Sequence, residues 1–592
     1  MFKSLQSFVK KHSLLFELLL VVIITVPAFM RLLNTGYFSM HDDEHIARLF
    51  LLDHGLRAGS LYPRWVEMLG FGYGYPLFNF YPPLIYYIAE AFHLVGFSLI
   101  WSIKFTFVTG FILAALGMYL LAKNIIGRTS AFLASTLYTY FFYHAVTSYV
   151  RGALAEFFSM AILPFIFLSI FNLSVKQNLK RSIFFGIFLG LLVLTHPLIA
   201  FPALFYIGVF FLFYFVQQKK ETRGRFFIFS LLGSIFGLCL SMFFWLPSYI
   251  ERKYTMTSSI LTTELANYKI HYVYPQQLWQ SLWGYGGSIA GPYDGLTFQI
   301  GKIHIIFTII SFLSFFLYLL FQKKQKVSVK LHFIAFFALT LFSLFMTTRF
   351  SSAIWDSISY LWFLQFPWRF LTFAGVFIAL TGSYWAFFIE KLKLPVSAFK
   401  HISPFLVLIS ILSILFFYQK YFIPERILYT NDSQLTAHSE IAWRVSRASF
   451  EFIPKDVATI KSEFNTTIPA IKKTDIPRDS FLDKGQKLKI IEKVSRPQEK
   501  IYQVINSNSQ SSLQINTFNF PGWSAYLDGK RIPITSSKEL RLILVYIPRG
   551  SHQLRIVFEN TNVRTVADII SIFTAIVLLG LLLKLRNKRE FH

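Results

Sequence analysis

The stretch LLFELLLVVIITVPAFMRLL at residues 14–33 decides the class of fold, because it is long and apolar enough to cross the hydrocarbon core of a bilayer. Similar stretches recur along the chain. Hydrophobic residues make up 54% of the 592 residues, 70 residues are Phe, and the mean hydropathy is +0.51. Soluble domains do not have such a composition. We therefore predict an all-α bundle that crosses the membrane many times.

We expect about twelve transmembrane helices, separated by short basic loops and a few long polar segments. The expected spans are residues 14–33, 98–121, 130–148, 153–173, 183–199, 201–217, 226–247, 303–321, 331–348, 370–389, 402–420 and 564–584. The segment 84–96 is apolar but too short for a span, so we expect a second surface helix or a re-entrant helix there.

The net charge is +27, and the Lys and Arg residues that cause it are distributed as the positive-inside rule describes. The charge therefore does not require a nucleic-acid partner. Lys and Arg gather in the N-terminal segment, in alternate loops and in the tail 584–589. Threading twelve spans puts these clusters on one side, which we take as the cytoplasm. Both termini are then cytoplasmic, and the outward segments are 34–97, 149–152, 248–302, 349–369 and 421–563. The first span is expected to be retained, because no small-residue cleavage site follows it.

The polar run HDDEH at residues 41–45 follows the first span. We expect a helix from about residue 42 that lies along the membrane surface. Its apolar stripe would hold Ile46, Leu49 and Phe50, and its polar stripe His41, Glu44, His45 and Arg48. Gly, Pro and aromatic residues are dense in GFGYGYP at 70–76 and FNFYPP at 78–83, which predicts an ordered, turn-rich loop.

A separate domain is expected between the last two spans. Asp528-Gly529, the preferred pair for a two-residue hairpin turn, lies between WSAYL (523–527) and KRIPI (530–534). Leu542–Ile547 and Gln553–Phe558 are further strand candidates, so we predict a small β-sandwich-like domain outside the membrane. The expected domains are 1–422, the membrane bundle with its large outer loop 34–97; 423–563, the β domain; and 564–592, the last span and a basic tail.

Several motifs resemble those of the GT-C superfamily, the multi-span glycosyltransferases that use polyprenyl-phosphate-linked sugars. More narrowly, they resemble the bacterial and archaeal membrane family labelled 6-pyruvoyl-tetrahydropterin synthase-related, a label that does not imply pterin chemistry. The matching pieces are His41-Asp42 with His45 and Arg48, Tyr62-Pro63-Arg64-Trp65, Gly74-Tyr75-Pro76, Phe80-Tyr81-Pro82-Pro83-Leu84, Arg151-Gly152-Ala153-Leu154-Ala155-Glu156, Thr195-His196 and Phe366-Pro367-Trp368-Arg369.

The resemblance implies an inverting transfer, in which an acceptor hydroxyl attacks the anomeric carbon and a polyprenyl phosphate leaves. Asp42 matches the superfamily's first-loop acid and is the expected general base, with Asp43 in reserve and Glu156 as the second outer-loop acid. The structural alternative is that these acids and histidines only solvate and cap the start of a helix. Capping does not require two histidines four residues apart, which favours catalysis.

The resemblance also implies contacts to the sugar and its phosphate. The expected substrate-binding residues are His41, His45, Arg48, Tyr62, Arg64, Tyr75, Asn79, Tyr81, Arg151, His196 and Arg369. Arg151 and Arg369 suit a phosphate, because guanidinium groups form forked contacts with it. Structural roles are open for all of these residues: an ion pair between Arg151 and Glu156, an interfacial anchor at Arg369, helix packing at His196 and packing of the aromatic loop on the bundle.

A divalent cation, Mg or Mn, is the one cofactor that the motif suggests. His41, Asp42 and His45 offer nitrogen and oxygen ligands at a spacing that fits one ion. The alternative is that both histidines hydrogen-bond the acceptor sugar or the neighbouring acids.

We therefore expect a multi-pass glycosyltransferase of the cell membrane that moves a sugar from a polyprenyl-phosphate donor to an extracytoplasmic lipid, glycan or protein. One alternative is a transporter or flippase of a lipid-linked saccharide, which would carry polar residues through the bilayer midplane and broken helices in two halves. Another is a noncatalytic glycan-binding scaffold, which would tolerate neutral replacements of the first-loop acids. The gathering of ionisable residues at the outer face favours the enzyme.

Overall fold

Ten helices of the computed structural model are long and apolar enough to cross a membrane, counted among residues 13–257, 260, 266–321, 327–391, 402–463, 466–483 and 488–590, which the structure describes. They are Ser13–Leu33, Leu99–Ile126, Leu154–Val175, Pro197–Gln217, Lys220–Leu240, Lys302–Phe321, Val327–Thr347, Pro367–Lys391, Ile402–Tyr421 and Asn562–Arg586. The prediction of a helical multi-pass membrane protein is confirmed. The basic stretches 1–12, 322–326 and 392–401 lie outside the described residues.

The span expected at 130–148 is interrupted in the structure. Helix α7 (Arg128–Thr139) ends before Tyr140, and α8 (Phe142–Ala145) then continues into a π-helical turn, η2 (Val146–Val150). The break brings Tyr143 and the residues after it into a second, short helical segment. π-helical turns are rare in proteins overall, and those that occur often lie at functional sites.

The span expected at 183–199 begins and ends four residues earlier than predicted. Helix α10 (Leu179–Thr195) has 17 residues and ends at His196, because Pro197 occupies the first position of α11 (Pro197–Gln217). The span expected at 226–247 similarly divides into α12 (Lys220–Leu240) and α13 (Met242–Glu251). The interruption at 130–148 and the 17-residue length of α10 explain why ten rather than twelve helices have full spanning length among the described residues, since α12 is one of the ten.

The chain forms two compact units, and each unit is built from separated segments of sequence. The first unit comprises residues 1–43, 104–238 and 267–429, and the second comprises 44–103, 239–266 and 430–592. The units differ from the three consecutive domains expected, since the outer loop after Asp43 belongs to the same unit as the β domain. The chain passes from one unit to the other within α6 (Leu99–Ile126) and again near the end of α12.

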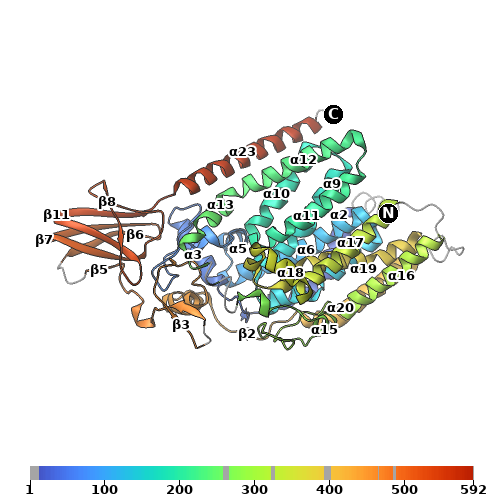
Figure 1. The fold of residues 1–592 in the computed structure, drawn as a ribbon, viewed down its shortest axis with the longest axis horizontal. Helices are drawn as coiled ribbons and strands as arrows, with labels where there is room; N and C mark the ends of the chain where they lie inside the picture. The colour runs from blue at the N-terminus through green and yellow to red at the C-terminus, as the bar shows by residue number, and fades with distance from the viewer. Residues whose placement is uncertain are drawn as a thin grey trace, which may run out of the picture. The chain divides into compact units, whose positions relative to one another are not determined.

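Helix α19 (Leu371–Lys391) lies at the centre of the first unit. It packs against α7, α16 (Lys302–Phe321), α17 (Val327–Thr347) and α20 (Ile402–Tyr418), and α16, α17 and α19 lie side by side in Figure 1. Its residues from Leu371 to Ala386 are all buried. A helix that is apolar on all sides belongs in the core of a bundle, which agrees with this position.

Helices α9 (Leu154–Val175), α10 and α11 pack together in the same unit. Glycines allow α10 and α12 to approach closely, since a Cβ on Gly186 would meet the carbonyl oxygen of Gly233 at 2.7 Å. The remaining elements of this unit are α2 (Ser13–Phe29), η1 (Met30–Leu33), β1 (Tyr37–Phe38), η5 (Tyr268–Ile270), α15 (Pro275–Trp279), η6 (Arg349–Ser351), α18 (Ser352–Ser357), η7 (Ser359–Leu364), η8 (Pro367–Phe370), η10 (Gln419–Tyr421) and β2 (Ile427–Leu428).

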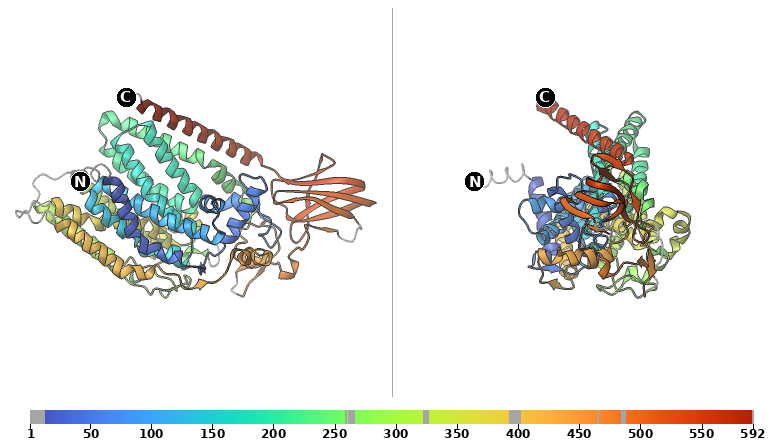
Figure 2. Two further views of the ribbon diagram at one scale, coloured as in Figure 1. Left: turned by 180° about the vertical axis from the view of Figure 1, so that it is seen from behind. Right: turned by 90° about the vertical axis from the view of Figure 1, so that its left-hand side faces the viewer.

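The second unit contains a seven-stranded antiparallel sheet, in which strands β5, β7, β11, β8 and β9 follow one another, β6 also pairs with β7, and β10 with β11. Figure 1 and the left view of Figure 2 show these strands, orange to red, as one sheet. The strands are β5 (Phe481–Asp483), β6 (Lys489–Arg496), β7 (Glu499–Phe518), β8 (Trp523–Leu527), β9 (Lys530–Ile532), β10 (Thr535–Ser536) and β11 (Leu542–Phe558). The mainly β domain before the last helix is confirmed.

One detail of this domain differs from the prediction. The two strand candidates on either side of Pro548-Arg549-Gly550 form a single long strand, β11, whose pairing with β7 shifts between Pro548 and Gly550. A proline there lacks one amide donor, and the shift in register accommodates it without ending the strand.

The helix expected along the membrane surface is largely buried instead. Helix α3 begins at His45 and ends at Arg57, and His45 and Arg48 are as buried as the apolar Ile46 and Leu49. Two members of the predicted polar stripe, His45 and Arg48, therefore face the interior of the unit. The short helix expected at 84–96 is present as α5 (Leu84–Leu94), which packs against α3.

First-loop residues also pack against the β domain within this unit. The Trp65 ring lies 5.2 Å from the rings of both Trp523 and Phe558. Further elements of the unit are α4 (Leu77–Phe80), η3 (Arg252–Tyr254), α21 (Asp432–Leu435), η11 (Glu440–Val445), α22 (Ser446–Ala448), β3 (Thr459–Lys461), β4 (Thr467–Pro469), η12 (Lys473–Asp475) and α23 (Asn562–Glu590).

The hairpin turn at Asp528-Gly529 carries a titratable pair. Both residues have positive φ (+49° and +80°), as the predicted tight turn requires. His552 Nδ1 lies 2.7 Å from Asp528 Oδ2, and the Gln553 amide donates to Oδ1 at 2.8 Å. The contact to His552, together with the amide bond, lowers the pKa of Asp528, and Asp528 raises the pKa of His552.

We predict that His552 titrates above its ordinary pKa of about 6.5 and that Asp528→Asn returns it to that value. The pair stabilises the turn only while both groups are charged. Its contribution should be lost as the pH rises through the raised pKa of His552, and again as the pH falls through the lowered pKa of Asp528. Histidine NMR of the full chain, assigned with His552→Gln, measures this. Equal pKa values for His552 in the wild type and in Asp528→Asn would contradict the prediction.

Candidate active site

The residues ahead of α3 are held against the loop that precedes α9. The amides of His41 and Asp42 donate to the carbonyls of Val150 and Arg151, at 3.1 and 2.8 Å. Gly152 has φ +63°, and a Cβ at this position would lie 2.3 Å from the sulfur of Met40 in the first loop. Only glycine fits such a position without strain. Two segments far apart in the sequence, the first outer loop and the loop before α9, are thereby fixed together.

Glu156 is the centre of a buried polar cluster. It lies in the first turn of α9, where the helix dipole favours a carboxylate. Its Oε2 accepts hydrogen bonds from Nη1 of Arg151 (2.7 Å) and Nε of Arg369 (3.2 Å), and its Oε1 accepts one from the Tyr143 hydroxyl. Only 1% of the Glu156 side chain is exposed. A carboxylate this buried would be very unfavourable without such partners, so the three donors keep it ionised.

The cluster carries one positive charge in excess, because two guanidinium groups share one carboxylate. The side chains of Arg151 and Arg369 are 8% and 9% exposed. Nη2 of each makes no hydrogen bond among the described residues, yet neither nitrogen is a fully buried atom. Both nitrogens are therefore available to an anion that enters from the accessible side.

Aromatic rings and a strained residue hold the two guanidinium groups in place. The Arg151 guanidinium lies 4.6 Å from the centre of the Trp368 ring, which stacks on Phe366. Nη1 of Arg369 donates to the Leu364 carbonyl at 2.8 Å. The next residue, Gln365, has φ +63°, a conformation that residues other than glycine rarely adopt. Strain of this kind is frequent at functional sites.

Asp42 is electrostatically coupled to the cluster. Burial by itself would lower the pKa of Arg151, but Glu156, Tyr143 and Asp42 together raise it well above the ordinary arginine value. The Asp42 carboxylate is half-buried and makes no hydrogen bond or ion pair among the described residues. It is thus close to a positive site and free to accept a proton from a ligand.

Two of the predicted site histidines, His41 and His196, have structural partners in this unit. Nε2 of His41 lies 2.8 Å from the carbonyl of Tyr285, which ties the first loop to a second outer loop. His196 ends α10 and caps α11, because its Nδ1 accepts from the Ile199 amide at 3.1 Å. This bond favours the helix-packing alternative for His196. The ring also interacts electrostatically with Glu156 and so lies at the edge of the cluster.

The donor set expected for a metal ion is not assembled. Among the described residues, no three His, Cys, Asp or Glu side chains gather in a way that could hold an ion. His41 precedes α3 whereas His45 lies inside it, so the two rings do not share a helical face. Nδ1 of His45 lies 3.0 Å from the Tyr86 hydroxyl. The cation site at His41, Asp42 and His45 stays a prediction, and we derive no step through an ion.

Four of the predicted substrate-binding residues lie in the interior of the second unit. Nη2 of Arg48 donates to Ser449 Oγ at 3.0 Å, and its guanidinium lies 4.0 Å from the centre of the Tyr81 ring. The Tyr75 hydroxyl donates to the Ser449 carbonyl at 3.0 Å. With His45, these side chains form a packed polar group whose partners are other residues of the unit. A role for them in substrate binding stays a prediction.

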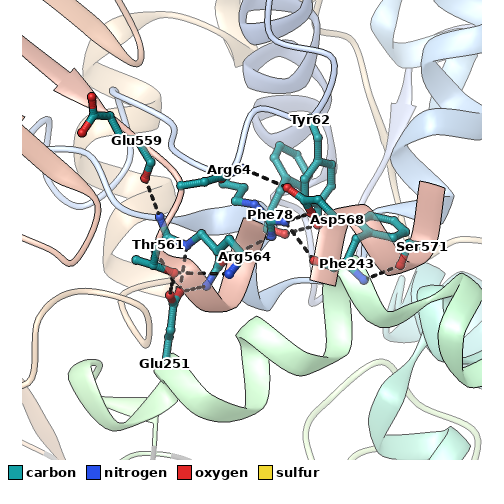
Figure 3. A network of polar contacts seen from close by, with 12 residues as sticks. Tyr62, Arg64, Phe78, Phe243, Glu251, Glu559, Thr561, Arg564, Asp568 and Ser571 are labelled. Carbon is teal, nitrogen blue, oxygen red and sulfur yellow. Dashed lines mark hydrogen bonds and ion pairs between the residues drawn. The ribbon is translucent and has the colours of Figure 1, made fainter. Parts of the chain in front are cut away.

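Tyr62, Arg64 and Asn79 belong to a second network, of which Figure 3 shows Tyr62 and Arg64 with their partners on α13 and α23. Arg64 donates to Asn79 Oδ1 (3.1 Å), the Phe243 carbonyl (2.9 Å) and Asp568 Oδ1 (2.6 Å). The Tyr62 ring lies 4.6 Å from the Arg64 guanidinium. These contacts join the first outer loop to α13 and α23.

Glu251 is the other acid of this network and is bound on both oxygens. Its Oε2 accepts from Asn79 (2.8 Å) and from two nitrogens of Arg564 (3.0 and 2.8 Å), and its Oε1 accepts from Thr561 (2.7 Å). Glu251 and Asp568 balance Arg64 and Arg564, so this network has no excess charge. Such a closed arrangement favours a structural role for Arg64 and Asn79.

Sequence reasoning missed several members of these clusters. Tyr143 lay inside an expected span, where a tyrosine carries no distinctive signal. Glu251, Arg564 and Asp568 were ionisable residues near the ends of expected spans, which is a recognised sign of buried pairing or function. That signal could have identified them, but not which residues they pair with.

We predict that Glu156→Gln lowers the stability of the protein by about 3–5 kcal/mol, because it leaves two buried guanidinium groups without a carboxylate. The free energy of unfolding, measured by SDS titration in mixed micelles, tests this. The exposed Glu425→Gln is the matched control and should differ by less than about 0.5 kcal/mol. Equal stability of the two variants would show that Glu156 does not hold the cluster together.

Glu251→Gln should destabilise by a similar amount, about 3–5 kcal/mol, since Arg564 is fully buried and would lose its only carboxylate. The same titration measures it, with the exposed Glu463→Gln as control in the same unit. A loss of activity without a loss of stability would contradict the structural role that we assign to this network.

No family model matches the sequence, and no curated protein matches it. Solved structures with a similar arrangement include mycobacterial arabinofuranosyltransferase AftD (11% identity, TM-score 0.44, 70% of this chain and 27% of that one). A second is the Archaeoglobus fulgidus oligosaccharyltransferase AglB, solved with an inhibitory peptide and a dolichol-phosphate (12% identity, TM-score 0.41, 76% of this chain and 60% of that one). A third is arabinosyltransferase EmbB from Mycobacterium smegmatis (12% identity, TM-score 0.36, 92% of this chain and 63% of that one). The chain thus spans from about a quarter to under two thirds of their lengths. The chain is similar to these glycosyltransferases at low identity, and its narrower family label stays a prediction.

Proposed function

We propose that the protein is a membrane glycosyltransferase that moves a sugar from a polyprenyl-phosphate donor to an extracytoplasmic lipid, glycan or protein acceptor, with inversion. The observation that carries the proposal is the Glu156 cluster. It combines a buried excess of positive charge with a carboxylate, Asp42, that is free to accept a proton. A transfer from a phosphate carrier needs both a base and a cationic site for the leaving group.

The first step of the proposed reaction takes place at the acceptor. Asp42 accepts the proton of an acceptor hydroxyl while that oxygen attacks the anomeric carbon from the face opposite the phosphate. The new carbon–oxygen bond forms as the bond to the phosphate oxygen breaks, and the electron pair leaves with the phosphate. The products are a glycoside of inverted configuration, a polyprenyl phosphate and a protonated Asp42, which then returns its proton to water.

The second requirement is stabilisation of the leaving phosphate. The free Nη2 atoms of Arg151 and Arg369 can each donate to a phosphate oxygen while Glu156 holds the two side chains in position. Electrostatic stabilisation of this type works best with preorganised donors in a water-poor site, and these side chains are nine-tenths buried. Glu156 is thus a positioning residue, rather than the second acid acting directly on the acceptor.

The sidedness of the reaction follows from the charge distribution. The positive-inside rule supports a cytoplasmic position for both termini, and we propose that the segments that carry Asp42, Arg151 and Arg369 face the outside of the cell membrane. A polyprenyl-phosphate sugar presented at the outer leaflet would meet them at the level of its headgroup. No nucleic-acid partner is needed to account for the basic charge.

We predict that the wild-type protein in nanodiscs transfers label from at least one radiolabelled polyprenyl-phosphate sugar to a membrane lipid extract. Asp42→Asn should lose at least about 100-fold of this activity, since a positioned base contributes about 10²–10⁴-fold. Asp43→Asn should lose less. Addition of EDTA, followed by Mg or Mn, tests the predicted cation requirement in the same assay.

The exposed Asp456→Asn, which lies outside the cluster, is the matched control and should retain wild-type activity. Equal transfer by Asp42→Asn and Asp456→Asn would exclude Asp42 as the base. Lipid-linked saccharide that moves between the leaflets without cleavage would instead establish a flippase. Glycan binding with no transfer from any donor would favour a scaffold.

A further inference from the structure

A second site of different character lies in the first unit. It is a cavity of about 560 Å³, within the usual range for small-molecule sites. Its walls are the loop 269–275, the loop at 290–291 and the segment 348–356, and the Val273 amide donates to the Thr347 carbonyl at 2.9 Å to hold two of the walls together. No residue of the Glu156 cluster lines it.

One part of the cavity offers aromatic surface. The side chains of Tyr274 and Phe350 are 40% and 74% exposed. Rings that are accessible within a cavity are suited to the apolar faces of small ring-shaped ligands, because they give large contact area at low cost in conformational entropy. Pyranose sugars have such faces, with hydroxyl groups around the edge.

A second part of the cavity carries charge. Nζ of Lys269 lies 3.3 Å from Asp356 Oδ1, so these two groups largely neutralise each other. Arg349 is exposed, and its guanidinium makes no hydrogen bond or ion pair among the described residues. The lining therefore has one positive charge in excess, and that charge is a planar guanidinium, the group best suited to a carboxylate or a phosphate.

The hydroxyl of Tyr272 is the third unusual feature. Tyr272 is one of the residues that line the cavity, and its hydroxyl oxygen is a buried atom with no hydrogen-bond partner among the described residues. Its ring is held by edge contacts to Tyr268 and Trp355, with ring centres 6.0 and 6.3 Å apart. A buried hydroxyl without a partner is unfavourable, so the Tyr272 hydroxyl gains a hydrogen bond if its ring turns toward a ligand in the cavity.

We propose that this cavity binds an acidic sugar unit, a hexose that bears a carboxylate or a phosphate. The anionic group contacts Arg349 and the sugar ring lies against Tyr274 and Phe350. The Tyr272 ring turns toward the ligand so that its hydroxyl bonds to a hydroxyl of the sugar. Resting on the proposed function, we assign this sugar to the acceptor. The transferase would then recognise an anionic saccharide at a subsite separate from the donor phosphate.

Saturation-transfer NMR on the full chain in phosphatidylcholine nanodiscs tests the proposal without any donor. Four probes separate the sources of binding: glucuronate, glucose 6-phosphate, glucose and glycerol 3-phosphate. We expect the two acidic sugars to bind at least about tenfold more tightly than either of the others, since the loss of one charged hydrogen bond or of the ring contact corresponds to about that ratio. Equal binding of glycerol 3-phosphate would identify a lipid-headgroup site, and no binding of the acidic sugars would refute the proposal.

Two variants test whether the acidic sugars bind in the cavity. Arg349→Gln should weaken the acidic sugars about tenfold and leave glucose unchanged. Tyr272→Phe should weaken the acidic sugars without lowering the melting temperature of the ligand-free protein, because it removes a hydroxyl that has no partner there. The matched control is Arg225→Gln. Arg225 is an exposed arginine of α12 that does not line the cavity, so this variant should bind the acidic sugars as the wild type does.

Wild-type affinity in Arg349→Gln would exclude the cavity as the binding site. The result is also distinguishable from failure of the proposed function. Sugar binding that depends on Arg349, in a protein that transfers no label, would overturn the transferase while keeping the ligand class of the cavity. Transfer of label by a protein that binds no acidic sugar would refute the ligand class of the cavity while keeping the transferase.

Discussion

The carboxylate of Glu156, shared between Arg151 and Arg369, is the interaction on which the rest of the candidate site depends. Taking these charges out of water costs several kcal/mol per ion, and only close, well-directed hydrogen bonds offset that cost. The distances of 2.7 and 3.2 Å provide them. The carboxylate therefore fixes residues from the loop before α9 and from the segment before α19 at one point. Without it, the two guanidinium groups would repel each other.

The Glu156 cluster and the Glu251 network differ in charge balance, and this difference is the basis on which we propose a functional role for the first and a structural role for the second. Glu251 and Asp568 neutralise Arg64 and Arg564 in the second unit, where the last helix, α13 and the first outer loop meet. The Glu156 cluster of the first unit has two arginines for one acid. A neutral network is complete in itself, whereas an excess of buried positive charge is stabilised further when an anion arrives. In the proposed function, the phosphate therefore binds to Arg151 and Arg369 rather than to Arg64.

The sequence was most informative about the features that depend on local pattern. Length and apolarity located the membrane helices, and Asp528-Gly529 located a tight turn that the structure confirms. Periodicity alone misassigned α3, because the same spacing of His41, His45 and Arg48 fits both a surface stripe and a buried helix with polar partners. The partners of Arg48 are Ser449 and Tyr81, and no local pattern reveals a contact between residues 401 positions apart. The pairing of Arg369 with Glu156 across 213 positions was equally hidden.

The central claim is that the excess positive charge of the Glu156 cluster binds the phosphate of a polyprenyl carrier. The most direct measurement is phosphorus NMR of a polyprenyl phosphate titrated with the protein in nanodiscs, for the wild type and for Arg369→Gln. This variant removes the excess charge but keeps the pair of Arg151 and Glu156, so it should fold. The account predicts saturable binding to the wild type and about tenfold weaker binding to the variant. Equal affinity of the two proteins, or no binding to the wild type, would contradict it.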